Sequence, residues 1–255
     1  MQIVTFTSDF GTQDYYVALL KGAILCRQNP IQLVDITHNV KNYDIVQAAF
    51  IFKNVWQSFP EGTIHILSIN DFDNANQGFL AIKHAGHYFI GPDNGLFWLV
   101  FEKLPEEVYE LPKIESGNFP LKDIYANAVL HIILQKSLLK IGKRLQNITQ
   151  RIALQPVTSQ SHIRGSVIHI DNYDNVIVNI SRDLFDKIGK NRPFALYFKR
   201  HEPITHLSKN YYDVPVGEIL CRFNSADCIE IAINMGKAAT LLGLNVEDVV
   251  QIDFQ

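Results

Sequence analysis

The chain has 255 residues, of which 47% are hydrophobic and 19% charged, enough to bury one large core or two smaller ones. The net charge of −3 and the lack of any lysine- or arginine-rich block argue against a nucleic-acid partner, which favours a basic face. Three cysteines, Cys26, Cys221 and Cys228, lack metal-ligand spacing. This odd number is typical of a reducing compartment.

The first apolar run, Ile3–Phe6, leads into the polar Thr7, Ser8 and Asp9. It is too short for a signal peptide or a membrane span. We therefore expect a cytoplasmic protein with no membrane partner.

Strand and helix patterns alternate in the first half of the chain. Short β-rich runs predict strands over residues 3–6, 32–36, 64–69, 79–83 and 87–90, and helical spacing predicts helices over 15–26, 44–56 and 125–141. Asp44 has the side chain of an N-cap, and Lys140, Lys143 and Arg144 suit a helix C-terminus. The alternation predicts an α/β domain over residues 1–148, with helices covering a mainly parallel sheet.

The pattern changes after about residue 148. Residues 149–163 are polar, contain Pro156 and lack a period, which predicts a linker. Short strands are predicted over residues 165–171, 175–180, 194–198, 217–223, 229–233 and 249–253, with one helix near 235–242 that ends at Gly243. This composition predicts a small antiparallel β-barrel-like domain over residues 164–255.

Polar residues follow the predicted strands of the first domain, where open α/β sheets bind ligands. Asp9, after the first strand, suits the hydroxyls of a ribose or, alternatively, caps the next helix. His38, after the second strand, is a candidate base or a histidine bonded to the backbone. Asp71 and Asp73, after the third strand, suggest an acid–base or metal site, or only a polar loop. We expect no metal.

In the second domain the best candidate site is the run from Asp171 to Asn175. It combines an acid, the aromatic Tyr173 and an amide, a set that suits a flat polar ring and a cation; the alternative is a simple hairpin turn. The segments near Ser225 and Met235 present backbone groups to a ligand or are turns beside a strand.

Taken in order, these segments resemble the S-adenosyl-L-methionine (SAM) hydroxide adenosyltransferase family, related to the fluorinases and chlorinases. The resemblance runs from Ile3 to Ile252. It rests on blocks that share order and spacing with the family: residues 7–11 with Asp14, 35–40, 91–96, Phe119, 170–171, Asn175, 224–225, 230–232 and 242–244.

The resemblance implies an N-terminal α/β domain, a C-terminal β-barrel-like domain and a homotrimer. It also implies a ligand site between one subunit's N-terminal domain and its neighbour's C-terminal domain. The family reaction displaces methionine from C5′ of SAM by water, hydroxide or halide, and the hydrolases form adenosine. SAM is substrate or ligand, and no cofactor is expected.

The resemblance also implies the roles of individual residues. Asp9 holds the ribose hydroxyls, with Tyr43 and Phe119 near the sugar. Carboxylates suit the ammonium group of the methionine end. The resemblance places Asp14, Asp171 and Ser225 at the methionine end. It places Tyr173, Asn175 and the Met235 backbone around the adenine.

Three positions depart from the family's hydrolases, which use an acid after the third strand, an arginine seven residues later and a histidine after the position of Phe119. Here these positions hold Asn70, Gln77 and Pro120. Asn70 is no base, Gln77 carries no charge and Pro120 moves no proton. Leu121 replaces a serine of the fluorinases.

The sequence leaves three functions open. In the first alternative, the chain is an active SAM hydrolase that has diverged, with Asp71 or Asp73 as a substitute base. Alternatively, it is a non-catalytic nucleoside-binding protein, a pseudoenzyme or sensor. The third alternative is a trimeric scaffold without a ligand.

Overall fold

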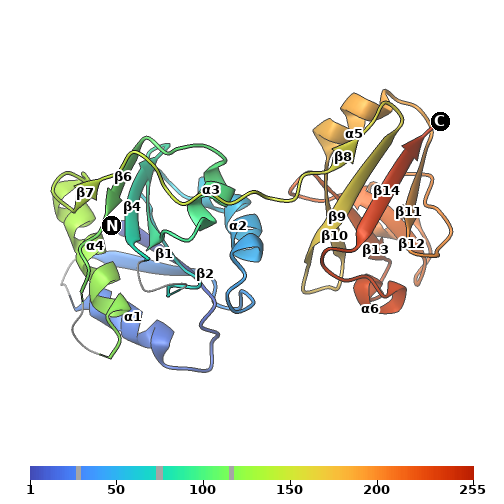
Figure 1. Cartoon of the computed structure of the whole chain (residues 1–255). Helices are drawn as coiled ribbons and strands as arrows, with labels where there is room; N and C mark the ends of the chain where they lie inside the picture. Colours follow the sequence, from blue (N-terminus) through green and yellow to red (C-terminus); the bar gives the residue numbers. More distant parts are fainter. Residues whose placement is uncertain (27–29, 73–76, 115–117) are drawn as a thin grey trace. The chain divides into compact units, whose positions relative to one another are not determined.

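The computed structural model describes residues 1–26, 30–72, 77–114 and 118–255. The chain forms two compact units, Met1–Ala153 and Leu154–Gln255, each with its own secondary structure (Figure 1). The division lies inside the expected linker. The later part of that segment forms β8 (Val157–Thr158), which pairs with β9 of the second unit.

A seven-stranded sheet forms the centre of the first unit, in the order β2-β1-β3-β5-β4-β6-β7. The neighbours β2, β1, β3 and β5 pair in parallel, whereas β4, β6 and β7 extend the sheet by antiparallel pairing. The strands are β1 (Gln2–Ser8), β2 (Ile31–Thr37), β3 (Ile64–Ser68), β4 (Phe79–His84), β5 (His87–Pro92), β6 (Glu107–Glu110) and β7 (Lys143–Arg144).

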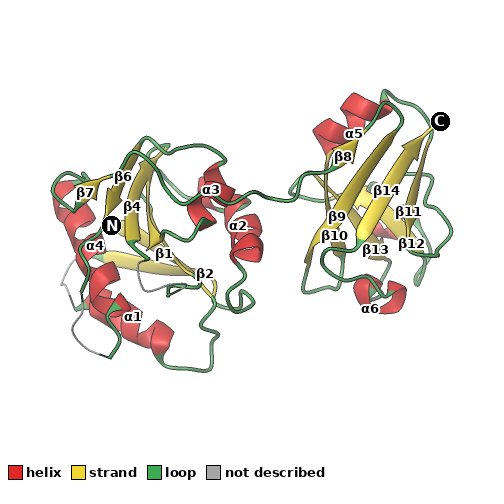
Figure 2. Cartoon of the chain, viewed as in Figure 1, coloured by secondary structure: helices red, strands yellow, loops and turns green. Residues whose placement is uncertain are grey.

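Helices cover both faces of this sheet (Figure 2). They are α1 (Tyr16–Leu25), α2 (Ile45–Lys53), the 3₁₀ turn η1 (Trp56–Ser58), α3 (Leu96–Phe101) and α4 (Leu121–Gln135). Because successive strand residues point to opposite faces, Val4 and Phe6 pack with α1 and α4, while Leu67 packs with α2 and α3. Asp44 caps α2, accepting from the backbone N–H of Gln47 at 2.9 Å.

Two helices of this unit differ from the sequence-based expectation. The helix expected over 125–141 begins at Leu121 and ends at Gln135, since Lys136 adopts a left-handed φ of 51°. The basic residues 140–144 therefore do not end it. The six residues of α3 are apolar almost throughout, so they have no helical periodicity and no helix was expected there.

The second unit is built on an antiparallel sheet in the order β11-β14-β9-β10-β13-β12. Its strands are β9 (His162–Ile170), β10 (Val176–Ser181), β11 (Phe194–Phe198), β12 (Ile219–Phe223), β13 (Cys228–Ile233) and β14 (Val249–Phe254). The predicted class, a helix-covered mainly parallel sheet followed by an antiparallel β-rich part, is confirmed.

Two helices and a 3₁₀ turn complete the second unit: α5 (Arg182–Gly189), η2 (Tyr211–Asp213) and α6 (Ala238–Leu242). Gly243 ends α6 at a φ of 64°, as expected. The sequence analysis missed α5, although its N-cap Ser181 accepts from the N–H of Leu184. Both helices pack on one core with residues such as Phe185, Leu196 and Ile231.

Candidate functional site

Asp9 lies at the carboxyl ends of the parallel strands, directly after β1. Its side chain is buried, and its Oδ2 accepts hydrogen bonds from the N–H groups of Tyr43 (2.9 Å) and Asn70 (3.3 Å). Tyr43 follows β2 and Asn70 follows β3, so three neighbouring strand ends fix one carboxylate. This is the edge at which open α/β sheets bind ligands.

The other carboxylate oxygen, Oδ1 of Asp9, has no hydrogen-bond partner within the described residues. A carboxylate oxygen accepts up to two hydrogen bonds. With Oδ2 already held by backbone donors, Asp9 presents Oδ1 in a fixed orientation. The arrangement therefore suits a ligand with neighbouring hydroxyl donors.

The turn after β2 holds Asp9 by its main chain as well. Nδ2 of Asn42 donates to the carbonyl oxygen of Asp9 at 2.9 Å. Tyr43 has a left-handed φ of 67° and a side chain that is 72% exposed. The backbone of Tyr43 thus fixes the carboxylate and its ring remains available for contact. Sequence reasoning missed Asn42, because its partner lies 33 residues away.

Phe119 belongs to an aromatic cluster beside the Asp9 turn. Its ring centroid lies 5.4 Å from that of Tyr16 and 6.3 Å from that of Phe10, the residue after Asp9. Pro120 follows at the N-cap of α4, and its carbonyl accepts from the N–H groups of Asp123 and Ile124. Proline suits this place because a helix start needs no N–H from it.

Amide side chains shape the loop after β3. Asn70 has a left-handed φ of 50°, and its carbonyl accepts from Nε2 of Gln77 (3.2 Å) and Nδ2 of Asn94 (3.3 Å). Gln77 also donates to the carbonyl of Asp71 at 2.8 Å, and Asn94 donates to Ile69 at 2.9 Å. Gln77 therefore holds the main chain of this loop.

Asp71 lies inside the first unit rather than on its surface. Its Oδ2 accepts from Oγ of Ser68 at 2.5 Å and its Oδ1 from the hydroxyl of Tyr125 at 2.7 Å. Burial, reinforced by the charge of Asp9, raises the pKa of Asp71 to about 7, although the two hydroxyl donors lower it. Asp73, the other candidate base, lies outside the described residues.

Asp14 is exposed in the segment between the Asp9 turn and α1. It precedes Tyr15 and Tyr16, whose ring centroids lie 4.7 Å apart. The structure thus places Asp14 on the surface near the start of α1, along the chain from Asp9 and Phe10.

In the second unit, Asp171 and Asn175 form a closed turn between β9 and β10. Oδ1 of Asp171 accepts from the N–H groups of Tyr173 (2.9 Å) and Asn175 (2.8 Å), and its Oδ2 accepts from Nδ2 of Asn175 at 3.0 Å. Asn175 is buried, whereas the Tyr173 side chain is 79% exposed. The three predicted residues therefore lie together.

Met235 and Ser225 lie at opposite ends of β13. Met235, 88% exposed with a φ of 54°, belongs to the loop before α6, whose Ala239 N–H donates to Asp174 at 2.9 Å. The exposed Ser225 lies in the turn before β13. The pairing of Val176 with Ile231 sets the Asp171–Asn175 turn at the Met235 end. This unit alone does not bring Ser225 to Asp171.

Glu230 is a buried acid that interacts electrostatically with Asp171. In the sequence it stands out only as part of the block 230–232. Glu230 accepts from the hydroxyl of Tyr211 at 2.8 Å, and Arg222 lies 4.6 Å from the centroid of that ring. Burial and Glu230 raise the pKa of Tyr211 to about 12, and burial also raises the pKa of Glu230. No sequence spacing marks this cluster, because β12–β13 pairing sets Arg222 opposite Glu230 and Tyr211 comes from a separate 3₁₀ turn.

Neither a metal-binding cluster nor a membrane-spanning helix is present among the described residues. Among the residues that the structure describes, no group of three or more histidine, cysteine or acidic side chains is arranged to hold a metal ion. Within the same residues, no helix combines the length and apolar character needed to cross a membrane.

Comparisons with known proteins agree with this architecture. The chain is 27% identical to the (R)-S-adenosyl-L-methionine hydrolase of Methanocaldococcus jannaschii, over 99% of this chain and 96% of that protein. It is also 27% identical to the protein of the same name from Thermus thermophilus, over 96% of each chain. The crystal structure of an uncharacterized conserved protein from Thermotoga maritima superposes with a TM-score of 0.87 at 26% identity, covering 98% of this chain and 99% of that one.

Family models match both units separately. Residues 4–142 match the SAM hydroxide adenosyltransferase N-terminal domain, and residues 165–251 match its C-terminal domain. These two matches cover most of the chain, in the order in which the family carries the domains, and the chain belongs to the SAM hydroxide adenosyltransferase family.

Proposed function

We propose that this chain binds SAM or adenosine, and that its hydrolysis of SAM to adenosine and methionine is slow or absent. The observation that carries the proposal is the Asp9 carboxylate, with Oδ2 held by two backbone N–H groups and Oδ1 open to a ligand. Such an acceptor suits the neighbouring hydroxyls of a ribose, because a charge-assisted hydrogen bond is stronger than a neutral one.

The proposed roles of the other residues follow the resemblance. Tyr43 and Phe119 pack near the sugar, and Tyr173, Asn175 and the Met235 backbone bind the adenine. Asp14 and Asp171 face the ammonium group of the methionine end. The resemblance places Ser225 there as well, although one unit does not bring it to Asp171. A homotrimer is proposed on the same basis, and light scattering of the purified protein tests it.

We propose slow hydrolysis because Asn70, Gln77 and Pro120 replace the acid, arginine and histidine of the family's hydrolases. Asn70 and Gln77 are amides, and Gln77 is engaged with two carbonyls of its own loop. Pro120 begins α4. A positioned acid or base contributes about 10²–10⁴-fold to a rate. The chain therefore acts as a pseudoenzyme or sensor, proposed to lie in the cytoplasm as its cysteine content indicates.

One observation favours an active hydrolase as the second candidate function. Asp71 has a pKa of about 7 and interacts electrostatically with Asp9, and a general base works best with a pKa near the ambient pH. Against this role, each oxygen of Asp71 already accepts a hydrogen bond from a hydroxyl group.

The experiment that tests the proposal measures binding and turnover together. Purified protein is titrated with adenosine and SAM by calorimetry, and adenosine and methionine are followed by chromatography after incubation with SAM. Asp9→Asn keeps the size of the side chain and removes its charge, and Asp9→Ala removes the acceptor. Asp186→Asn, on the exposed side of α5, is the matched control.

We expect wild-type protein and Asp186→Asn to bind equally, and both Asp9 variants to bind at least about tenfold more weakly, the range for a hydrogen bond to a charged group. Little or no adenosine should form. Turnover that disappears in Asp9→Ala and in Asp71→Asn would establish the second candidate. Absence of binding to either compound by wild-type protein would leave the ligand-free scaffold.

A further inference from the structure

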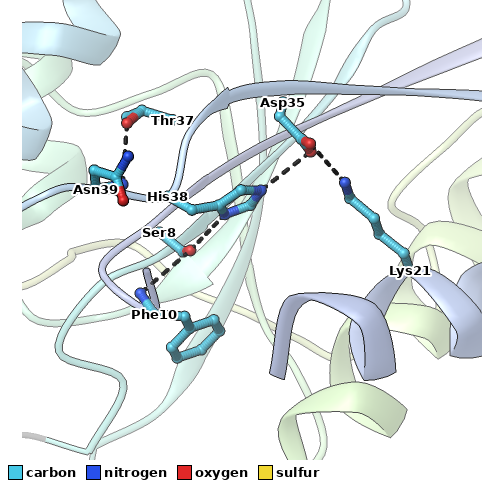
Figure 3. Close-up of polar contacts among 7 residues, drawn as sticks. All are labelled: Ser8, Phe10, Lys21, Asp35, Thr37, His38 and Asn39. Atoms are coloured by element: carbon cyan, nitrogen blue, oxygen red, sulfur yellow. Dashed lines mark hydrogen bonds and ion pairs between the residues drawn. The ribbon is translucent and has the colours of Figure 1, made fainter. Parts of the chain in front are cut away.

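A row of four polar side chains includes Ser8, the residue directly before Asp9 (Figure 3). Oγ of Ser8 lies 2.7 Å from Nδ1 of His38, and Nε2 of His38 lies 3.1 Å from Oδ1 of Asp35. Nζ of Lys21, from α1, donates to Oδ2 of Asp35 at 2.6 Å. The row thus runs from the partly exposed Lys21 and Asp35 to the buried Ser8 and His38.

An irregularity in the sheet creates this row. The β1–β2 pairing is Phe6 with Asp35 and then Thr7 with Thr37, so β2 carries one extra residue at that point. A bulge of this kind re-aims the side chains that follow it. His38 therefore comes beside Ser8, the last residue of β1.

His38 contacts the chain on both sides of Asp9. Its side chain meets Ser8, and its carbonyl oxygen accepts from the N–H of Gly11 at 2.7 Å. The Oγ of Ser8 also lies 3.5 Å from the N–H of Phe10, a weak hydrogen bond. The turn that carries Asp9 is thus tied to one histidine before and after the carboxylate.

The serine, histidine and acid do not form a nucleophilic triad. The Ser8 side chain is only 2% exposed, so a substrate cannot reach its hydroxyl. The contacts of Ser8 and His38 instead hold the main chain of the turn that carries Asp9.

The charge on Asp35 defines which nitrogen of His38 carries the proton. Burial would raise the pKa of Asp35, but its contacts with Lys21 and His38 lower it, so the group is a carboxylate at neutral pH. A carboxylate beside Nε2 favours the proton on that nitrogen, although Nε2 and Oδ1 are not well aligned for a hydrogen bond. Nδ1 is then the acceptor for the Ser8 hydroxyl, whose oxygen is left to accept from Phe10.

We propose that His38 is a positioning residue, which acts through Ser8 to hold the Asp9 carboxylate in the orientation that binds the ribose hydroxyls of the ligand. This inference rests on the proposed function. Asp35 acts one step further away, by orienting His38. None of the three residues contacts the ligand.

Two substitutions of His38 separate its two contacts. The side-chain amide of Asn reaches the position of Nδ1, so His38→Asn keeps the bond to Ser8. The amide of Gln reaches the position of Nε2, so His38→Gln keeps only the contact with Asp35. We expect His38→Gln and Ser8→Ala to bind adenosine about tenfold more weakly, the effect of about one hydrogen bond. His38→Asn should restore the affinity to within about threefold, and the exposed His201→Gln is the control.

A ligand without the hydroxyls distinguishes positioning from general damage to the fold. If His38 acts through Asp9, His38→Gln should not weaken binding of 2′,3′-dideoxyadenosine relative to wild-type protein. Equal losses for both ligands, or equal affinities of the Asn and Gln variants for adenosine, would overturn the inference.

A measurement without ligand keeps this test separate from the proposed function. Hydrogen exchange at Phe10 and Gly11 should become faster in His38→Gln and Ser8→Ala than in His38→Asn. If wild-type protein binds neither adenosine nor SAM, the proposed function is wrong and binding through Asp9 with it. Unchanged exchange in all three variants shows that His38 does not position the turn.

Discussion

At the scale of single residues, the first unit keeps an acid where solvent does not reach. Both oxygens of Asp71 accept hydroxyl hydrogen bonds, from Ser68 and Tyr125, and Tyr125 is fully buried. Asp9, which directly follows Ser8, the partner of Ser68 in the neighbouring strand, adds a second negative charge nearby. Ionising Asp71 therefore costs free energy that the two hydroxyl donors only partly offset.

This cost predicts how Asp71→Asn changes stability. The pKa of Asp71 is about 7 in the folded protein and about 3.8 when unfolded. Because the folded state binds the proton more tightly, the free energy of unfolding falls as the pH rises from about 4 to 7. Asn is always neutral, so the variant does not pay the cost of ionising a buried carboxyl group. It should be about 1–2 kcal/mol more stable than wild-type protein at pH 8.

Urea unfolding of both proteins at pH 5 and pH 8 measures the difference. The gain should shrink at pH 5, where most of the wild-type carboxyl is protonated. A variant less stable than wild-type protein at pH 8 would mean that the charged carboxylate itself stabilises the fold through its hydroxyl donors.

The sequence marks Asp9, Asp171 and Asn175 as candidate site residues because acids and amides at strand ends are visible as a pattern. It did not identify their partners. The N–H groups of Tyr43 and Asn70 meet Asp9 only when three strands come together. The one-residue bulge that sets His38 beside Ser8 leaves no mark in the spacing. The sequence therefore offered a base or a backbone-bonded histidine, whereas the ring of His38 meets the side chains of Ser8 and Asp35.

At the scale of elements, histidines link the central strands of the first sheet. Nδ1 of His65 on β3 lies 2.7 Å from Oγ1 of Thr5 on β1, and its Nε2 lies 3.2 Å from Nδ1 of His87 on β5. His65 and His87 are buried, so a neutral pair in which one ring donates to the other is required. Burial lowers the pKa of His65 to about 3, and repulsion between the two rings when both are protonated contributes.

The buried His65 should make the free energy of unfolding fall in acid. The folded pKa of His65, about 3, lies below its usual value of 6.5. The unfolded chain therefore binds the proton more readily, and stability is lost as the pH falls from about 6.5 toward 3, at up to about 1.4 kcal/mol per pH unit. His65→Asn keeps a contact with Thr5 and removes the titrating group. Its urea midpoint should depend less on pH in this window, while His201→Gln should match wild-type protein.

The strands were easier to predict than the helices for a physical reason. Buried β-branched runs such as Ile64–Ser68 carry their signal locally. The end of α4 depends on Lys136 entering a left-handed conformation, and α3 is apolar throughout because both of its sides are covered. Polar α5 has its N-cap at Ser181, but only one large buried side chain, Phe185, marks its inner face.

At the scale of the whole molecule, each unit has its own core. The first unit buries both faces of its sheet, and the second buries residues of six strands and two helices in one cluster. The segment before the division belongs to the first unit, since the N–H of Thr149 donates to Asp93 at 2.8 Å and Arg151 packs where a side chain at Gly95 would lie. A cut after Ala153 therefore separates the chain into the two compact units.

We expect the separately produced chains 1–153 and 154–255 each to fold, because a domain with its own core is stable by itself. Each should unfold cooperatively in urea and show dispersed amide resonances. The proposed ligand contacts are divided between Asp9 in one unit and Asn175 in the other, so neither piece alone should bind adenosine with the affinity of the whole chain. A piece that remains unfolded would show that its core depends on the other unit. Full affinity in residues 1–153 would mean that the Asp171–Asn175 turn does not contact the nucleoside.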